Sequence, residues 1–146
     1  MENIEKNTID SFRNGLNCAQ AVFAAFSEKL GYDKEMALRT SAGFGGGMGH
    51  LQETCGVVTG AFMVIGMYNS QLYPDNQTRK EKSYQMIQDF NSRFLEIHLS
   101  TKCMNLIDCD LNTDEGRALV KERRIHETIC EGCLATSVRV LNDMIS

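Results

Sequence analysis

The sequence predicts an all-α fold, a single-domain bundle of about six or seven helices around a buried, glycine-rich central helix. Apolar residues recur at spacings of three and four along most of the chain. No segment alternates at period two for long enough to predict a strand, and one proline stands among 146 residues. Neither an internal repeat nor a linker divides the sequence, so residues 1–146 are expected to form one domain.

Three helices are expected ahead of the glycine-rich segment. Residues 3–13 carry apolar side chains at helical spacing. Asn17 followed by Gln20 is a variant of the capping box that begins a helix, and Gly31 suits the position just after its end. A third helix is expected over residues 33–41, where the first aspartate provides the cap.

The central helix follows five glycines in the seven residues 43–49, which relax the backbone and allow close approach. Thr54 is expected to cap a helix over residues 55–68 that is apolar on nearly every side and therefore buried. Each glycine inside this helix costs roughly 1 kcal/mol against alanine, which predicts close contact with another helix. These glycines are Gly56, Gly60 and Gly66.

The second half of the chain predicts a long helix over residues 76–98, then an irregular or briefly helical segment to Asn112. A charged helix is expected from Thr113 to about Glu127, and a last helix over residues 130–145. The expected buried face of the long helix carries Tyr84, Ile87, Phe90, Phe94 and Ile97.

Charge and hydropathy exclude several classes of partner. A net charge of −4 gives no electrostatic reason to expect nucleic acid or an anionic membrane surface. The most apolar stretch, residues 57–67, is far shorter than the roughly 20 residues that cross a bilayer, so no membrane insertion is expected. No basic leader followed by an apolar run opens the sequence, which predicts a cytoplasmic location.

Six cysteines carry the main functional signal in the sequence. In a reducing compartment they favour metal ligation or redox chemistry over a disulfide framework, and a cysteine can also be a small buried apolar residue. The six are Cys18, Cys55, Cys103, Cys109, Cys130 and Cys133.

Cys18 and Cys55 each follow a residue expected to cap a helix. In a first helical turn, free N–H groups and the macrodipole favour a thiolate, so both thiols are expected to have a lowered pKa. Such a thiol is prepared to attack or to bind a metal. The alternative is that both are small residues buried where helices touch.

Cys130 and Cys133 form a lone CxxC, which suits a redox pair or half of a metal site. Leu134 stands where covalent haem attachment requires histidine, and no second CxxC completes a zinc ribbon. The glycine run has no following lysine and no preceding strand, so a dinucleotide site is not expected. His50 is a candidate ligand or proton relay or else faces solvent, while His98 and His126 are expected to be structural or exposed.

Three ordered segments, residues 17–22, 43–47 and 53–60, resemble the C_GCAxxG_C_C family, named for suspected redox activity. The resemblance spans nearly the whole chain. The family's CGAxxG motif has alanine where this chain has Val57, which adds two methyl groups. The family pattern contains four cysteines. Cys18, Cys55 and Cys103 match it, the fourth is Cys133 or Cys130 with Cys133 preferred, and Cys109 falls outside it.

The resemblance implies a bacterial or archaeal protein with an electron-transfer or oxidoreductase role, acting with a redox partner or a small molecule. Cys18 and Cys55 are the expected catalytic thiols. Four thiolates would hold an iron–sulfur cluster or zinc, or two would cycle between dithiol and disulfide. The expected metal ligands are Cys18, Cys55, Cys103 and Cys133, and the expected cofactor contacts are Gly45, Gly46, Gly47 and Gly56.

Two other classes of function remain open at this point. One is a structural or adaptor domain, in which the cysteines are buried and the apolar helices form a homodimer. The other is an accessory protein to a transporter, since family members are sometimes encoded beside transporters, or a small-ligand binder with the glycine run as a pocket wall.

Overall fold

A computed structural model describes residues 3–145, and this part of the chain is all-α, as predicted. It contains no strand, and its one isolated antiparallel bridge joins Thr54 and Lys102. No helix in residues 3–145 is both long enough and apolar enough to cross a membrane. The helices are α1 (Asn3–Arg13), α2 (Cys18–Lys29), α3 (Lys34–Thr40), α4 (Gly45–Met48), α5 (Gly56–Leu72), α6 (Asn76–His98), α7 (Cys103–Ile107), α8 (Asp114–Glu122) and α9 (Glu131–Ile145). A 3₁₀ turn (Ala42–Phe44) precedes α4, and a π turn (His126–Cys130) runs directly into α9.

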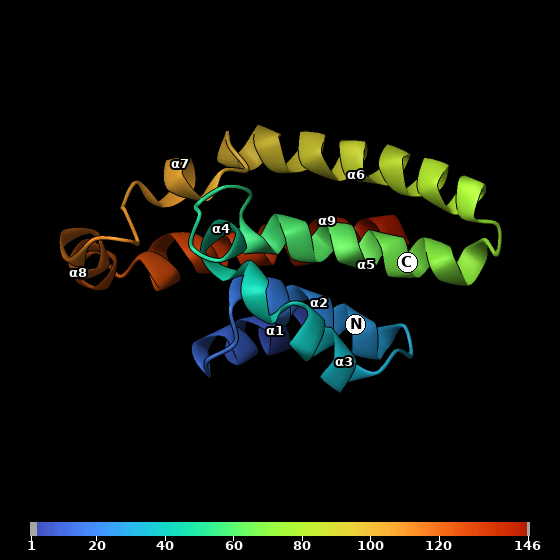
Figure 1. Ribbon diagram of the computed structural model, residues 1–146, viewed down its shortest axis with the longest axis horizontal. Helices are drawn as coiled ribbons and strands as arrows, with labels where there is room; N and C mark the ends of the chain where they lie inside the picture. The colour runs from blue at the N-terminus through green and yellow to red at the C-terminus, as the bar shows by residue number, and fades with distance from the viewer. Residues whose placement is uncertain (1–2, 146) are drawn as a thin grey trace.

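The helices form three layers around α5 (Figure 1). One outer layer holds α1, α2 and α3, the central layer holds α5 and α9, and α6 lies across the other side. The largest fully buried side chains come from all three layers: Phe26, Ile65, Phe90, Phe94 and Leu134. Burying each such side chain contributes roughly 1.5–3 kcal/mol, so this main core holds the layers together. The prediction of a buried, glycine-rich central helix is confirmed.

Glycines let α5 approach α2 closely. A Cβ atom on Gly56 would lie 2.8 Å from the backbone nitrogen of Ala19, and one on Gly60 would lie 3.0 Å from the Ala19 carbonyl oxygen. The predicted close contact is therefore confirmed at these two positions. It is wrong for Gly66, which has open space where a Cβ would stand.

Local capping signals locate most helix ends correctly. Asn17 and Gln20 form the predicted reciprocal capping box at the start of α2. Gly31 follows the helix with a φ of +84°, which a glycine adopts without strain. Thr113 caps α8, also as predicted.

Thr54 does not cap α5, and this prediction is wrong. The N-cap is Cys55, and Thr54 instead bridges to Lys102. The Cys55 amide donates to the Thr101 carbonyl at 2.7 Å, which keeps the chain extended up to Cys55. A tertiary hydrogen bond therefore moves the start of the helix by one residue.

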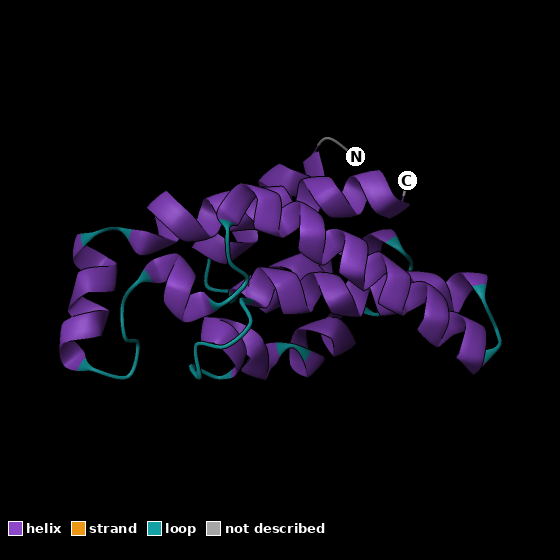
Figure 2. Ribbon diagram, turned by 90° about the horizontal axis from the view of Figure 1, so that it is seen from above, coloured by secondary structure: helices purple, strands orange, loops and turns teal. Residues whose placement is uncertain are grey.

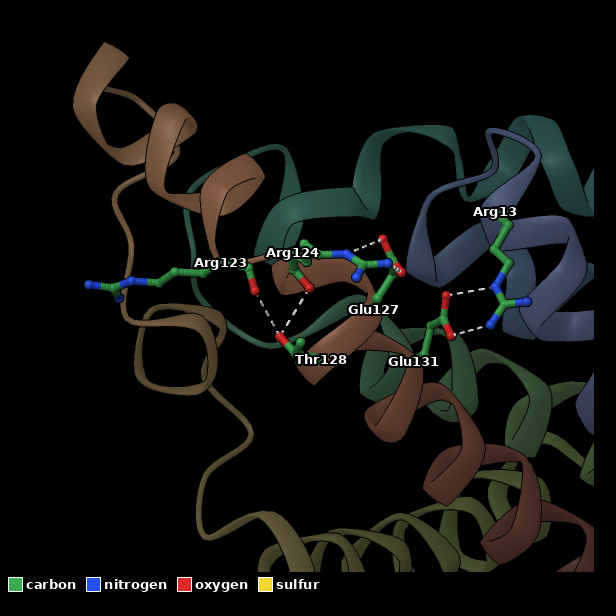
Figure 3. A network of polar contacts seen from close by, with 6 residues as sticks. All are labelled: Arg13, Arg123, Arg124, Glu127, Thr128 and Glu131. Carbon is green, nitrogen blue, oxygen red and sulfur yellow. Dashed lines mark hydrogen bonds and ion pairs between the residues drawn. The ribbon is translucent and has the colours of Figure 1, made fainter.

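The charged helix predicted to reach about Glu127 ends earlier, at Glu122. Arg124 has a φ of +51°, which breaks the helix before the π turn begins. The Thr128 hydroxyl donates to the carbonyls of Arg123 and Arg124, at 3.3 and 3.0 Å, and stabilises this break (Figure 3). As a result α8 projects from one end of the bundle on exposed loops (Figure 2).

The long helix α6 has the bounds predicted for it. Its buried face is narrower than predicted, because Tyr84 and Ile97 are 58% and 61% exposed while Phe90 and Phe94 are fully buried. The helix packs against α5 and α9 on one side only, so residues at the margins of the apolar stripe face outward.

Candidate functional site

Five of the six cysteines line one cavity of about 690 Å³. It lies at the end of the bundle where α2, α5 and α9 begin (Figure 1). The five are Cys18, Cys55, Cys103, Cys130 and Cys133. The sixth, Cys109, does not line the cavity; it lies in a small apolar cluster together with Cys103, with its sulfur 3.9 Å from Arg123 Nη1.

Helix starts supply the first three thiols. Cys18 is the first residue of α2, Cys55 is the N-cap of α5, and Cys103 is the first residue of α7. Two backbone hydrogen bonds hold Cys103 beside Cys55: Cys55 N donates to Thr101 O at 2.7 Å, and Cys103 N donates to Glu53 O at 2.6 Å.

The Gln52 side chain holds the segment that follows Cys103 in place. It is 2% exposed, donates to the Cys109 carbonyl at 2.6 Å and accepts from the Leu111 amide at 2.8 Å. Because both ends of the amide are satisfied, burying it costs little and fixes the segment after Cys103 against the glycine-rich segment. The sequence analysis did not single out Gln52.

The glycines of the predicted cofactor set lie against the cysteine-bearing segments. A Cβ on Gly47 would lie 2.7 Å from Cys103 Cβ, and one on Gly56 would lie 3.0 Å from Cys18 Cβ. Gly47 and Gly56 therefore contact other parts of the chain, and the absence of their side chains leaves room for Cys103 and Cys18 at the cavity wall. A Cβ on Gly45 would lie 2.7 Å from Asn17 Cβ, and one on Gly46 would collide with the His50 ring. Cofactor binding by the four glycines stays a prediction.

Cys18 and Cys130 both line the cavity, and each affects the ionisation of the other. The interaction with Cys18 lowers the pKa of the half-buried Cys130 thiol, and the same interaction, together with burial, raises the pKa of Cys18. Of the two sulfurs, Cys130 is the better site for a thiolate because Cys18 can donate its S–H to it.

The other cavity thiols are held neutral by burial. Burial raises the pKa of Cys55 well above its ordinary value, although the Val57 amide acts against this without forming a full cap hydrogen bond. Burial also raises the pKa of Cys103 to about 11 and of Cys133 to about 12. The expectation that helix starts lower the pKa of Cys18 and Cys55 is therefore wrong, since desolvation of a buried thiolate outweighs the helix terminus.

Cys133 also contacts a histidine from another helix. Its sulfur lies 3.8 Å from His98 Nδ1, and His98 Nε2 lies 2.8 Å from Thr136 Oγ1. Burial lowers the pKa of His98, which favours the neutral imidazole. The sequence analysis expected a structural or exposed role for His98 because no sequence pattern links it to Cys133.

An ion pair borders the cavity beside Cys130. Arg13 donates from Nε and Nη2 to the two carboxylate oxygens of Glu131, at 2.8 and 2.7 Å (Figure 3). The Glu131 side chain is 13% exposed, and the Arg13 pair lowers its pKa. Next to it, Arg124 pairs with Glu127 in the π turn. π turns frequently occur at functional sites, and this one ends at Cys130.

The two remaining histidines lie at the cavity edge. His50 is exposed and lines the cavity, and His126 does so with its ring edge-on to Phe12, at a centroid distance of 5.4 Å. Whether His50 relays protons or binds a ligand stays a prediction.

The predicted metal ligands do not form one tight group. Across residues 3–145, no three cysteine, histidine, aspartate or glutamate side chains converge closely enough to hold a metal ion. Cys18, Cys55, Cys103 and Cys133 share the cavity, but in this arrangement they do not fit a four-thiolate zinc or iron–sulfur site. Metal ligation stays a prediction.

Cys130 was the less preferred candidate for the fourth cysteine of the family pattern. The choice of Cys133 over Cys130 treated the two as alternatives, yet both line the cavity. The available signal was their spacing, because residues three apart share one face of a helix.

Comparison with protein-family models gives a match over most of the chain. The model of one family, with the description "Putative redox-active protein (C_GCAxxG_C_C)", matches residues 16–144. No curated protein and no solved structure matches the chain significantly. Because the match covers almost the whole sequence and includes all six cysteines, the chain belongs to the C_GCAxxG_C_C family.

Proposed function

We propose that this protein carries out thiol–disulfide exchange, with Cys130 as the attacking thiolate and Cys18 as the thiol that resolves the mixed disulfide. The observation that carries the proposal is the convergence of five thiols on one cavity, Cys18 and Cys130 among them. The interaction between these two lowers the pKa of Cys130 and raises that of Cys18. In the reducing cytoplasm that the sequence predicts, such a pair would rest as the dithiol.

Cys130 has the properties of the attacking group. It is more accessible than Cys133 or Cys103, and its pKa is the one that is lowered among the cavity thiols. Attack in thiol–disulfide exchange requires a thiolate, so a lowered pKa increases the reactive fraction at neutral pH. Cys18, protonated and adjacent, suits the second step.

The exchange balances without a further cofactor. The Cys130 thiolate attacks one sulfur of a partner disulfide, forming a mixed disulfide and releasing one partner thiolate. Cys18 then loses its proton to that thiolate, and its sulfur attacks Cys130 Sγ. The Cys18–Cys130 bond forms, the second partner thiolate leaves, and two electrons have passed to the partner disulfide.

The partner we propose is a small disulfide or an exposed protein disulfide. The cavity volume of about 690 Å³ is large enough for a compact ligand, and its glycine wall has no side chains to obstruct one. The thiol pair would act in the opposite direction on a reduced partner, because exchange is reversible and the redox potentials decide its direction.

The test is disulfide mapping in redox buffers. The reduced protein is equilibrated with reduced and oxidised glutathione at several ratios, quenched with an alkylating agent and analysed by peptide mass spectrometry. We expect a Cys18–Cys130 disulfide as the first bond to form. In Cys18→Ser, the mixed disulfide with glutathione should accumulate on Cys130 instead.

Cys109→Ser is the matched control, since Cys109 is buried outside the cavity and should leave the first disulfide unchanged. Formation of no bond at Cys130 in any buffer would overturn the proposal. Elemental analysis and a visible spectrum of protein prepared without oxygen provide an independent check. Stoichiometric zinc or iron bound to the cavity thiols would support the metal prediction in its place.

A further inference from the structure

Cys133 differs from the other cavity thiols because an imidazole reaches it. Its side chain is 1% exposed, yet it lines the cavity, and its sulfur lies 3.8 Å from His98 Nδ1. The proposed exchange between Cys18 and Cys130 leaves this contact without a role.

His98 is held in place from two sides. It is the last residue of α6, and its ring packs against Phe94 one turn earlier, at a centroid distance of 4.6 Å. Its Nε2 lies 2.8 Å from the hydroxyl of Thr136, which is buried on α9 one turn after Cys133. With its proton on Nε2, the imidazole donates to Thr136 and leaves Nδ1 as an acceptor facing Cys133.

We infer that His98 is the base that accepts the Cys133 proton, so that Cys133 is a second nucleophile of the cavity, acting on a disulfide. Thr136 is the positioning residue that holds the imidazole in the required tautomer. The substrate class rests on the proposed function, whereas the thiol–imidazole pair rests on its own geometry.

The step balances in protons and electrons. The Cys133 S–H proton moves to His98 Nδ1 while the sulfur electron pair forms a bond to the nearer sulfur of a disulfide. The S–S bond of that disulfide breaks, and the leaving thiolate takes the proton back from the imidazolium. The disulfide that reacts is an incoming partner disulfide or the Cys18–Cys130 disulfide itself.

A base is required because Cys133 is poor at ionising alone. Burial raises its pKa, and a negative charge on Cys130 or Cys103 raises it further. An uncompensated thiolate here would be a buried charge, whereas a thiolate beside an imidazolium is a neutral pair overall. A nucleophile, a base and a third group that orients the base are the signature of an activated thiol.

The test is the rate at which methyl methanethiosulfonate, a small neutral disulfide analogue, modifies Cys133 in the full chain. Cys130→Ser serves as the background, so that the measurement does not depend on the Cys18–Cys130 exchange. Fragmentation of the peptide assigns the modification to Cys133. We expect His98→Phe to slow modification about tenfold.

Thr136 provides the variants that keep the test independent of folding defects. Thr136→Val removes the hydroxyl at similar volume and should slow modification about threefold, whereas Thr136→Ser keeps the hydroxyl and should retain the rate. Equal rates in the parent, His98→Phe and Thr136→Val would overturn the inference. The Cys18–Cys130 bond cannot form in this background. A failure of the proposed Cys18–Cys130 exchange would therefore appear only in the disulfide mapping, not in these rates.

Discussion

Arg13 and Glu131 join the end of α1 to the start of α9 through two parallel hydrogen bonds, of 2.8 and 2.7 Å. Glu131 follows Cys130 directly in the sequence, so its carboxylate is the one nearest along the chain to the proposed attacking thiol. Arg13 neutralises the charge of this carboxylate. A second bidentate pair joins Glu5, near the start of α1, to Arg139 in the middle of α9. The two pairs connect the same helices, but only one adjoins the cavity.

We predict that Arg13→Ala reduces the reactivity of Cys130. Without Arg13, the Glu131 carboxylate acts on Cys130 unopposed and raises the pKa of its thiol. The rate of Cys130 alkylation by iodoacetamide at pH 7 should fall by roughly 1.5- to 5-fold. Arg139→Ala is the matched control and should leave the rate unchanged. An equal effect of both variants would mean that helix packing, not charge, is responsible.

Removal of the Cys18 thiol should shift the pH dependence of Cys130 upward. The interaction with Cys18 lowers the pKa of Cys130, so in Cys18→Ala that pKa rises and less thiolate is present at neutral pH. The midpoint of the alkylation rate against pH should therefore move to higher pH. Cys109→Ala should keep the parental midpoint, and the same midpoint in Cys18→Ala would contradict the assigned coupling.

Two alanine substitutions in α5 should have opposite effects on the free energy of unfolding. Gly56→Ala places a Cβ 2.8 Å from the Ala19 backbone and should destabilise by about 1–3 kcal/mol through overpacking. Gly66→Ala, in the same helix with open space, should stabilise by up to about 1 kcal/mol. Urea denaturation measures both. Destabilisation of equal size at the two positions would show that close contact with α2 is not the cause.

Acid should weaken the start of α6 through its cap. The Asp75 carboxylate accepts from the Thr78 amide and hydroxyl, both at 2.9 Å, and these bonds lower its pKa. Its contribution is therefore present above the unfolded-state pKa of about 3.9 and is lost as the pH falls through the lower folded-state value. Asp75→Asn keeps the acceptor without titrating. The parent should lose urea stability relative to Asp75→Asn on acidification, and parallel curves would refute this.

Much of the helical framework could be predicted from the sequence because it depends on short-range interactions. The capping box at Asn17, the glycine at position 31 and the cap at Thr113 act through neighbouring backbone atoms, so their effect is visible in a few adjacent residues. The segment after Cys55 predicted a buried central helix because its residues are apolar on nearly every side of a helix, which is also visible in a short stretch of sequence. The cysteine spacing and motifs also identified the family, which the comparison confirms.

Helical periodicity and capping are short-range, so they predict an all-α chain with a buried central helix and cysteines at helix starts. Which thiols meet depends on the tertiary fold, because the interaction of Cys130 with Cys18 and the contact of Cys133 with His98 join distant parts of the chain. The fold also reversed the pKa direction expected for two thiols: the interaction with Cys130, together with burial, raises the pKa of Cys18, and burial raises that of Cys55. Desolvation depends on the whole fold and not on neighbouring residues in the sequence.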